Sequence, residues 1–152
     1  MCLIDGCVNQ KIFAKGLCSK HYKKLRRNTI KDEIIDKSCW SIENIAWVAG
    51  LIEGEGNFNL RESKLSMRIR VRMTDLDVLQ KAYNLFKIGK IYGPYYRKNP
   101  KHKTAWEWSI NRHNQVVELC RVIAPYLLSR RLQQMNNMLK GYHSYASTKM
   151  FV

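Results

Sequence analysis

The segment of residues 47–58, with the sequence WVAGLIEGEGNF, constrains the fold more than any other part of the chain. It is typical of an apolar helix that ends at two acidic residues flanked by glycines. One face of this helix is nearly free of large side chains and carries Ala46, Ala49, Gly50 and Glu53. Because a glycine within a helix costs about 1 kcal/mol relative to alanine, we expect a second helix to pack closely against this face.

The acidic residues at the end of this helix need a compensating partner. Gly54 and Gly56 predict a tight exit into an extended segment, which fixes Glu55 at the helix end. A helix C-terminus carries partial negative charge, so a carboxylate there is unfavourable unless a cation or hydrogen-bond donors face it. A divalent metal ion is one such partner. The alternative is that Gly-Glu-Gly is only a helix cap followed by a turn.

Residues 48–56, followed by Asn57 and Phe58, resemble the nine-residue signature of the LAGLIDADG homing endonucleases. The resemblance implies an α+β fold of the order αββαββα, in which helices cover one face of a saddle-shaped antiparallel sheet. It also implies that two signature helices cross through the small faces described above, which would form a dimer interface. The last acid of the signature, here Glu55, would then hold Mg²⁺ or Mn²⁺ at the scissile phosphates, aided by the Gly54 carbonyl.

The chain holds one copy of this signature, whereas the chemistry implied by the resemblance needs two. We therefore expect a homodimeric endonuclease, of the kind associated with intron or intein mobility, that cleaves a near-palindromic double-stranded DNA target. The resemblance also places Arg130 where the family has a catalytic lysine, with Arg131 beside it; the alternative for both is surface charge. A second interpretation is a DNA-binding regulator or an RNA-splicing maturase that uses the same scaffold without cleavage.

The charge of the chain agrees with a nucleic-acid partner. Its 27 lysines and arginines against 12 acids give a formal net charge of +15, spread over the whole sequence. Such a positive field favours a polyanion and predicts a steep salt dependence of binding. No stretch approaches the roughly 18 consecutive apolar residues of a spanning helix, and residues 1–5 lack a signal-peptide pattern. We therefore expect an intracellular protein without a membrane partner.

The N-terminal segment contains Cys2, Cys7, Cys18 and His21, which together offer the four ligands that tetrahedral zinc prefers. We expect a closed structural Zn²⁺ site, because so short a segment cannot bury enough apolar surface to fold without such support. The alternative is coincidence, with the thiols free or buried. Residues 16–27 also resemble the small zinc-binding units attached to some phage-type homing endonucleases.

The helix of this unit would carry basic residues that contact DNA phosphates beside the main site, namely Lys23, Lys24, Arg26 and Arg27. The alternative is a solvated basic face. We place a zinc-finger-like unit at residues 1–27, a polar linker at 28–40 and the endonuclease domain at 41–152. Ser41 is the expected N-cap of the signature helix.

Two strand patterns follow the signature. In residues 65–74 polar and apolar residues alternate, so one face of the strand is cationic and the other is apolar. The same alternation holds in residues 57–61 and 105–111. The polar residues expected to face DNA are Asn57, Asn59, Arg61, Ser66, Arg68, Arg70, Arg72, Glu107 and Ser109. Arginine and asparagine side chains pair with base edges in the major groove; the alternative is an ordinary half-exposed sheet with a basic outer face.

Periodicity predicts the remaining elements: helices at residues 76–87, 114–124 and 126–140, and a strand at residues 90–97 that pairs with residues 105–111. Pro94 indicates an edge strand or a bulge. Pro125 is expected to end the second of these helices.

Overall fold

The computed structural model describes residues 3, 6–8, 10–23, 34–61, 66–96 and 103–149, with side chains described as far as Ser144 in the last helix. The chain divides into two compact units, residues 1–34 and 35–152. Each unit has a hydrophobic cluster of its own. No helix among the described residues has both the length and the apolar character that crossing a bilayer requires.

Helix α2 (Ile42–Glu55) begins, as predicted, directly after Ser41. The Ser41 hydroxyl accepts a 3.3 Å hydrogen bond from a backbone N–H of the first helical turn, which caps the helix. Strand β1 (Gly56–Arg61) follows α2 without a loop. Glycine is required at position 56, because a Cβ there would lie 2.4 Å from the Ile52 carbonyl oxygen. The predicted tight exit from the helix is therefore confirmed.

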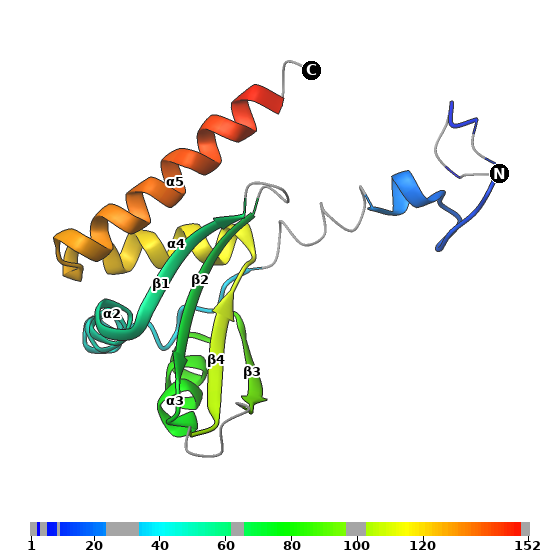
Figure 1. The fold of residues 1–152 in the computed structure, drawn as a ribbon. Coiled ribbons are helices and arrows are strands. Elements are labelled where there is room, and N and C mark those ends of the chain that lie inside the picture. The colour runs from blue at the N-terminus through cyan, green and yellow to red at the C-terminus, as the bar shows by residue number, and fades with distance from the viewer. Residues whose placement is uncertain are drawn as a thin grey trace. The chain divides into compact units, whose positions relative to one another are not determined.

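Four antiparallel strands form one sheet in the order β1-β2-β4-β3 (Figure 1). β1 pairs with β2 (Ser66–Met73), β2 with β4 (Ala105–Ile110), and β4 with β3 (Lys90–Tyr95). The predicted α+β fold with an antiparallel sheet is confirmed. β3 is an edge strand whose pairing shifts next to Pro94, as that proline predicted.

Helices α2, α3 (Leu76–Phe86) and α4 (His113–Ile123) pack against the apolar face of this sheet (Figure 1). On that face Ile69 of β2 and Trp108 of β4 are completely buried, as the period-two alternation predicted. The same cluster contains the buried side chains of all three helices. The core of the larger unit therefore lies between the helices and one side of the sheet, and the polar residues of the strands lie on the other side.

The last helix differs from the prediction. Residues Ala124–Tyr126 form a short 3₁₀ helix, and α5 runs from Ser129 to Lys149. Pro125 lies within the 3₁₀ turn, and Leu127 after the turn is extended, with φ −86° and ψ 143°, so the α-helix begins only beyond it. The predicted start at Tyr126 and end near residue 140 are therefore wrong. Packing of α5 against β1 supports a longer helix than its own apolar pattern indicates.

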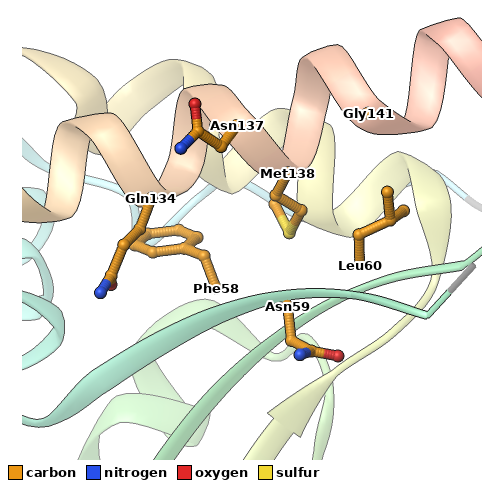
Figure 2. A pocket seen from close by; sticks show the side chains of 7 residues that line it. All are labelled: Phe58, Asn59, Leu60, Gln134, Asn137, Met138 and Gly141. Atoms are coloured by element: carbon orange, nitrogen blue, oxygen red, sulfur yellow. The ribbon is translucent and has the colours of Figure 1, made fainter.

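A groove of about 380 Å³ lies between β1 and α5 (Figure 2). Phe58 and Leu60 point from β1 toward α5, whereas Asn59 points to the other side of the strand. A Cβ at Gly141 would lie 2.7 Å from the Leu60 side chain, so glycine allows the helix and the strand to approach closely. This arrangement confirms the alternation predicted for β1 and leaves Asn59 on the polar face.

Part of the segment expected to be a linker packs on the larger unit. Ile35 and Trp40 contact its core, and the Trp40 indole N–H donates to the Phe86 carbonyl oxygen at 3.3 Å. Residues 34–37 are not helical. Residues 35–40 therefore belong to the larger unit, and the division between the units falls after Ile34.

The smaller unit contains a tight turn at Lys15 and Gly16, both of which have positive φ. The turn is closed by backbone hydrogen bonds between the residues that flank it. Among the described residues of this unit, Leu17 and Cys18 are buried, and residues 19–23 are helical. So small a cluster among the described residues agrees with the expectation that this segment needs a bound metal for stability.

Candidate metal and nucleic-acid site

The end of α2 is held by the start of α5. The Glu53 carboxylate accepts a hydrogen bond from the Leu128 backbone N–H at 3.0 Å. Arg131 of α5 donates from Nε to the Glu53 carbonyl oxygen at 2.9 Å and from Nη2 to the Gly54 carbonyl oxygen at 3.0 Å. Its Nη1 donates to the Gln134 side chain at 2.9 Å. We call Glu53, Gly54, Leu128 and Arg131 the clasp.

The clasp explains why two adjacent arginines differ. Arg131 is 7% exposed, and it satisfies carbonyl groups at the end of α2 that have no partner within the helix. Its charge also lies at the negative end of the helix dipole. The alternative that Arg131 is ordinary surface charge is therefore wrong, whereas Arg130 is exposed.

Glu55 is the last residue of α2 and directly follows the clasp residue Gly54. Its side chain is exposed and forms no hydrogen bond or ion pair with any residue that the structure describes. The Gly54 carbonyl oxygen accepts one hydrogen bond from Arg131 and retains a second lone pair. Mg²⁺ prefers oxygen ligands of these two kinds, combined with water and phosphate oxygens. The two residues therefore fit as the ligands that this chain contributes.

The residues expected at a helix crossing do not share one open surface. Ala49 is 0% exposed and packs in the core of its own chain, so it is inaccessible to a second subunit, contrary to expectation. Glu53 belongs to the clasp. Ala46 is half-buried and Gly50 is exposed. A Cβ at Gly50 or Gly54 would meet nothing within 4 Å. The open surface of α2 therefore follows residues 46, 50 and 54, four positions apart.

Strands β1 and β2 carry the predicted polar face. Its exposed members are Asn57, Asn59, Arg61 and Arg72, and its half-buried members are Ser66, Arg68 and Arg70. In the strand register Asn57 lies opposite Arg70, and Asn59 lies opposite Arg68. The Arg70 Nη2 donates to the Asn57 Oδ1 at 3.4 Å. The alternation that the sequence predicted in both strands is confirmed.

Glu107 and Ser109 of β4 lie on the same polar face but are buried, with exposed fractions of 5% and 2%. Arg68 covers them, because its Nη2 donates to Glu107 Oε1 at 2.9 Å and its Nε donates to Ser109 Oγ at 3.1 Å. The Arg70 Nη1 lies 3.9 Å from the other Glu107 carboxylate oxygen. This corrects the expectation that Glu107 and Ser109 extend the exposed row; they support its arginines from below.

Sequence reasoning missed the contribution of β3 to this face. Tyr92 lies opposite Glu107 in the register, so its side chain belongs to the polar side of the sheet. The Arg72 guanidinium carbon lies 4.6 Å from the centre of the Tyr95 ring. Because the pairing shifts between Tyr92 and Tyr95, counting alternate residues could not place the Tyr95 ring. Pro94 signalled the bulge but not the direction of that side chain.

The smaller unit brings three of its predicted ligands together. Cys7 Sγ lies 3.9 Å from Cys18 Sγ, and Cys18 Sγ lies 3.5 Å from His21 Nδ1. Tetrahedral zinc, with bonds of about 2.3 Å to sulfur and 2.0 Å to nitrogen, places two sulfurs roughly 3.8 Å apart and a sulfur and a nitrogen roughly 3.5 Å apart. Both of these pairs therefore have the spacing that one zinc ion needs, and all three ligand atoms lie within 4.8 Å of one another. Cys2, the expected fourth ligand, lies outside the described residues.

The basic residues expected on the helix of this unit are only partly described. Lys23 is exposed, whereas Lys24, Arg26 and Arg27 lie outside the described residues. The exposed position of Lys23 fits both a phosphate contact and a solvated basic face. Its role therefore stays a prediction.

The sequence model of the LAGLIDADG endonuclease family matches residues 48–142, more than half of the chain. No curated protein matches this sequence. The solved structure of I-SmaMI, a LAGLIDADG homing endonuclease bound to cleaved DNA, is similar at 16% identity with a TM-score of 0.53 over 71% of this chain. The LAGLIDADG meganuclease I-AabMI bound to uncleaved DNA is similar at 17% identity, with a TM-score of 0.56 over 71% of this chain. The homing endonuclease I-CvuI, in complex with its target in the presence of Ca, is similar at 17% identity, with a TM-score of 0.51 over 72% of this chain.

These structures differ in how much of their length the chain accounts for. The matched part covers 38% of I-SmaMI and 39% of I-AabMI but 73% of I-CvuI. The chain therefore spans less than two fifths of the first two proteins. At these identities the structural likeness establishes the fold.

Proposed function

The chain belongs to the LAGLIDADG endonuclease family, and from this premise we propose that it is a site-specific, metal-dependent endonuclease for double-stranded DNA. The observation that carries the proposal is the exposed Glu55 carboxylate at the end of α2. It lies two residues before Asn57, the first side chain of the polar face. A metal-binding carboxylate at the border of a cationic surface is placed to meet the phosphates of a duplex lying on that surface.

We infer that Glu55 and the Gly54 carbonyl hold Mg²⁺ or Mn²⁺. An ion bound there supplies an activated water nucleophile and stabilises the charge on the attacking and departing oxygens. The clasp keeps the Gly54 carbonyl in place through Arg131. Arg130 lies between Leu128 and Arg131, the two clasp residues of α5 and its preceding turn, and would offset the charge that develops on the phosphate.

Two such sites are needed to cut both strands, and one chain supplies one Glu55. We propose a homodimer in which two α2 helices cross along the open surface of Ala46, Gly50 and Gly54, where small residues let backbones approach. The single copy of the signature, at residues 48–56, supports this proposal. A two-fold dimer predicts a near-palindromic target.

We propose that the polar face of β1 and β2 lies in the major groove. It presents the side chains Asn57, Asn59, Arg61, Ser66, Arg70 and Arg72, and the net charge of +15 strengthens attraction to DNA. The I-SmaMI, I-AabMI and I-CvuI structures were each solved with DNA bound, which supports the same partner for this chain. With DNA as its partner, the protein would act inside the cell.

For the smaller unit we propose a structural Zn²⁺ held by Cys7, Cys18 and His21, with Cys2 as the fourth ligand. The spacing of the three described ligands supports this proposal. A closed four-ligand site leaves no position for substrate, so its role is to stabilise the unit. The basic residues from Lys23 to Arg27 would then contact phosphates beside the target of the larger unit.

The test is a cleavage assay with the full chain. The substrate is a plasmid that carries the insertion locus of the chain's own gene with the insertion removed, and the control is the same plasmid without the locus. In Mg²⁺ or Mn²⁺ we expect a linear product from the first plasmid only. Tight specific binding without cutting in either metal would favour the regulator or maturase interpretation, and absence of any specific binding would overturn both.

A further inference from the structure

The three arginines of β2 differ in how many of their donors are already used. Arg68 directs its Nε and Nη2, which form one edge of the guanidinium, to Ser109 and Glu107 at 3.1 and 2.9 Å. Its side chain is 23% exposed. An arginine recognises guanine with two parallel donors from one edge, and this edge of Arg68 is occupied within the protein.

Arg70 is held more loosely. Its Nη1 lies 3.9 Å from the Glu107 carboxylate, and its Nη2 donates to Asn57 at 3.4 Å. Both distances are longer than those of a strong charge-assisted hydrogen bond. Arg70 can therefore turn toward a ligand, although it must leave the Glu107 carboxylate to do so.

Within the described part of the chain, Arg72 is held neither by the Glu107 carboxylate nor by a neighbouring polar side chain. Its side chain is exposed, and among the residues that the structure describes it forms no ion pair. The contact it makes is with the Tyr95 ring, whose centre lies 4.6 Å from the guanidinium carbon. Because this is a cation–π contact and not a hydrogen bond, it does not use the N–H donors of the guanidinium.

We propose that Arg72 is the specificity-determining arginine of this sheet, that it recognises a guanine through the O6 and N7 acceptors of the major groove, and that Tyr95 is its positioning residue. This inference rests on the proposed function, because it needs DNA on the polar face. Arg68 is then a structural support for β2 and β4 that recognises no base.

The Tyr95 contact favours base recognition because it restricts Arg72 before DNA binds. A long side chain loses conformational entropy when a ligand immobilises it, and a side chain already held against a ring loses less. Glu107 contributes as well, since its carboxylate is engaged by Arg68 and Arg70 and does not draw Arg72 away from the groove. The competing role for Arg72 is a phosphate contact, which would lower affinity for all sequences alike when removed.

The experiment selects bound sequences from a randomised library of DNA duplexes with the full chain in Ca²⁺ and compares the enriched sequences. The variants are Arg72→Ala, Tyr95→Ala and Tyr95→Phe, which keeps the ring. Arg121→Ala is the matched control, because it removes the same charge from α4 on the other side of the sheet. Thermal unfolding verifies that each variant is folded.

We expect Arg72→Ala to lower the preference for guanine at one position of each half-site by about tenfold or more, with other positions unchanged. Tyr95→Ala should lower it about threefold, and Tyr95→Phe and Arg121→Ala should match the parent. An unchanged guanine preference in Arg72→Ala, or a uniform loss across all sequences, would overturn the assignment of Arg72. Parent-like selection by Tyr95→Ala would overturn the role of Tyr95. If the parent itself enriched no sequence, the proposed function would fail and this inference with it.

Discussion

The Arg131 guanidinium donates a 3.0 Å hydrogen bond to the Gly54 carbonyl oxygen, which joins the start of α5 to the end of α2. It donates a second bond to the preceding carbonyl, and its own side chain is buried. The last turn of the signature helix is thus held by a residue far along the chain. The position of the residue that follows, Glu55, depends on this contact.

Replacing Arg131 by methionine should therefore destabilise the larger unit. We expect the free energy of unfolding to fall by roughly 2 kcal/mol, because two carbonyl groups lose their buried donor. The matched variant is Arg130→Met at the adjacent exposed position. It should change the free energy of unfolding by less than about 0.5 kcal/mol, but it should slow cleavage about a hundredfold. Urea unfolding and single-turnover cleavage measure the two effects. Equal stability of Arg131→Met and the parent would contradict the clasp.

The proposed dimer is tested at Gly50. A Cβ at this position meets nothing in the single chain, so Gly50→Leu should leave the monomer folded. If two α2 helices approach there, the larger side chain should separate them and convert the dimer to a monomer without cleavage activity. Gln80→Leu adds the same side chain at an exposed position of α3 and should stay dimeric. Sedimentation velocity decides the matter, and a dimeric Gly50→Leu would exclude this surface.

The smaller unit should contain one zinc ion per chain. Because metal binding and folding of so small a unit are coupled, a strong chelator should make residues 1–23 sensitive to protease while residues 35–149 stay protected. Cys18→Ser should lose the ion without a chelator, whereas Cys39→Ser, an exposed cysteine outside the cluster, should retain it. Elemental analysis and limited proteolysis provide the measurements. If the protein contained no zinc and its smaller unit still resisted protease, the proposed zinc site would be contradicted.

A pH effect is expected at Glu118 of α4. Hydrogen bonds from Arg121 and Lys37 lower the pKa of this carboxyl to about 2, from a usual value near 4.5. A pKa that is lower in the folded state stabilises the fold above the unfolded value, and this contribution disappears as the pH falls from about 4.5 toward 2. Because the Lys37 side chain is 46% exposed, the contribution is about 1 kcal/mol or less.

Glu118→Gln should therefore be less stable than the parent at pH 6, and the difference should shrink below pH 4.5. Tryptophan fluorescence during urea unfolding reports on the larger unit alone, since all four tryptophans belong to it. A difference that stays constant from pH 6 to pH 2.5 would show that these ion pairs do not couple to folding.

Much of the fold could be predicted from the sequence because the relevant signals are local. Ser41, the glycines after Ile52, and the alternation in β1 and β2 each act on immediate neighbours in the chain. The signature also located Glu55 at a helix end. Pro94 and Pro125 indicated interruptions of a strand and of a helix. In the structure, Pro125 lies inside a 3₁₀ turn and not simply at the end of a helix.

The features that could not be predicted depend on contacts between distant residues. Arg131 differs from Arg130 only because α5 presents it to a carbonyl group 77 residues earlier in the chain. Glu107 follows the same alternation as its exposed counterparts, but Arg68 from the neighbouring strand covers it. The burial of Ala49 likewise depends on which side of α2 meets the core. No periodicity in a single segment contains this information.

The central claim is that Glu55 acts on DNA as a metal-binding carboxylate, and Glu55→Gln tests it most directly. The variant keeps the size of the side chain and removes its charge at an exposed position, so folding and DNA binding without divalent metal should match the parent. Cleavage of the target plasmid in Mg²⁺ should fall by at least about a hundredfold. Cleavage by Glu55→Gln at the parent rate would contradict the account.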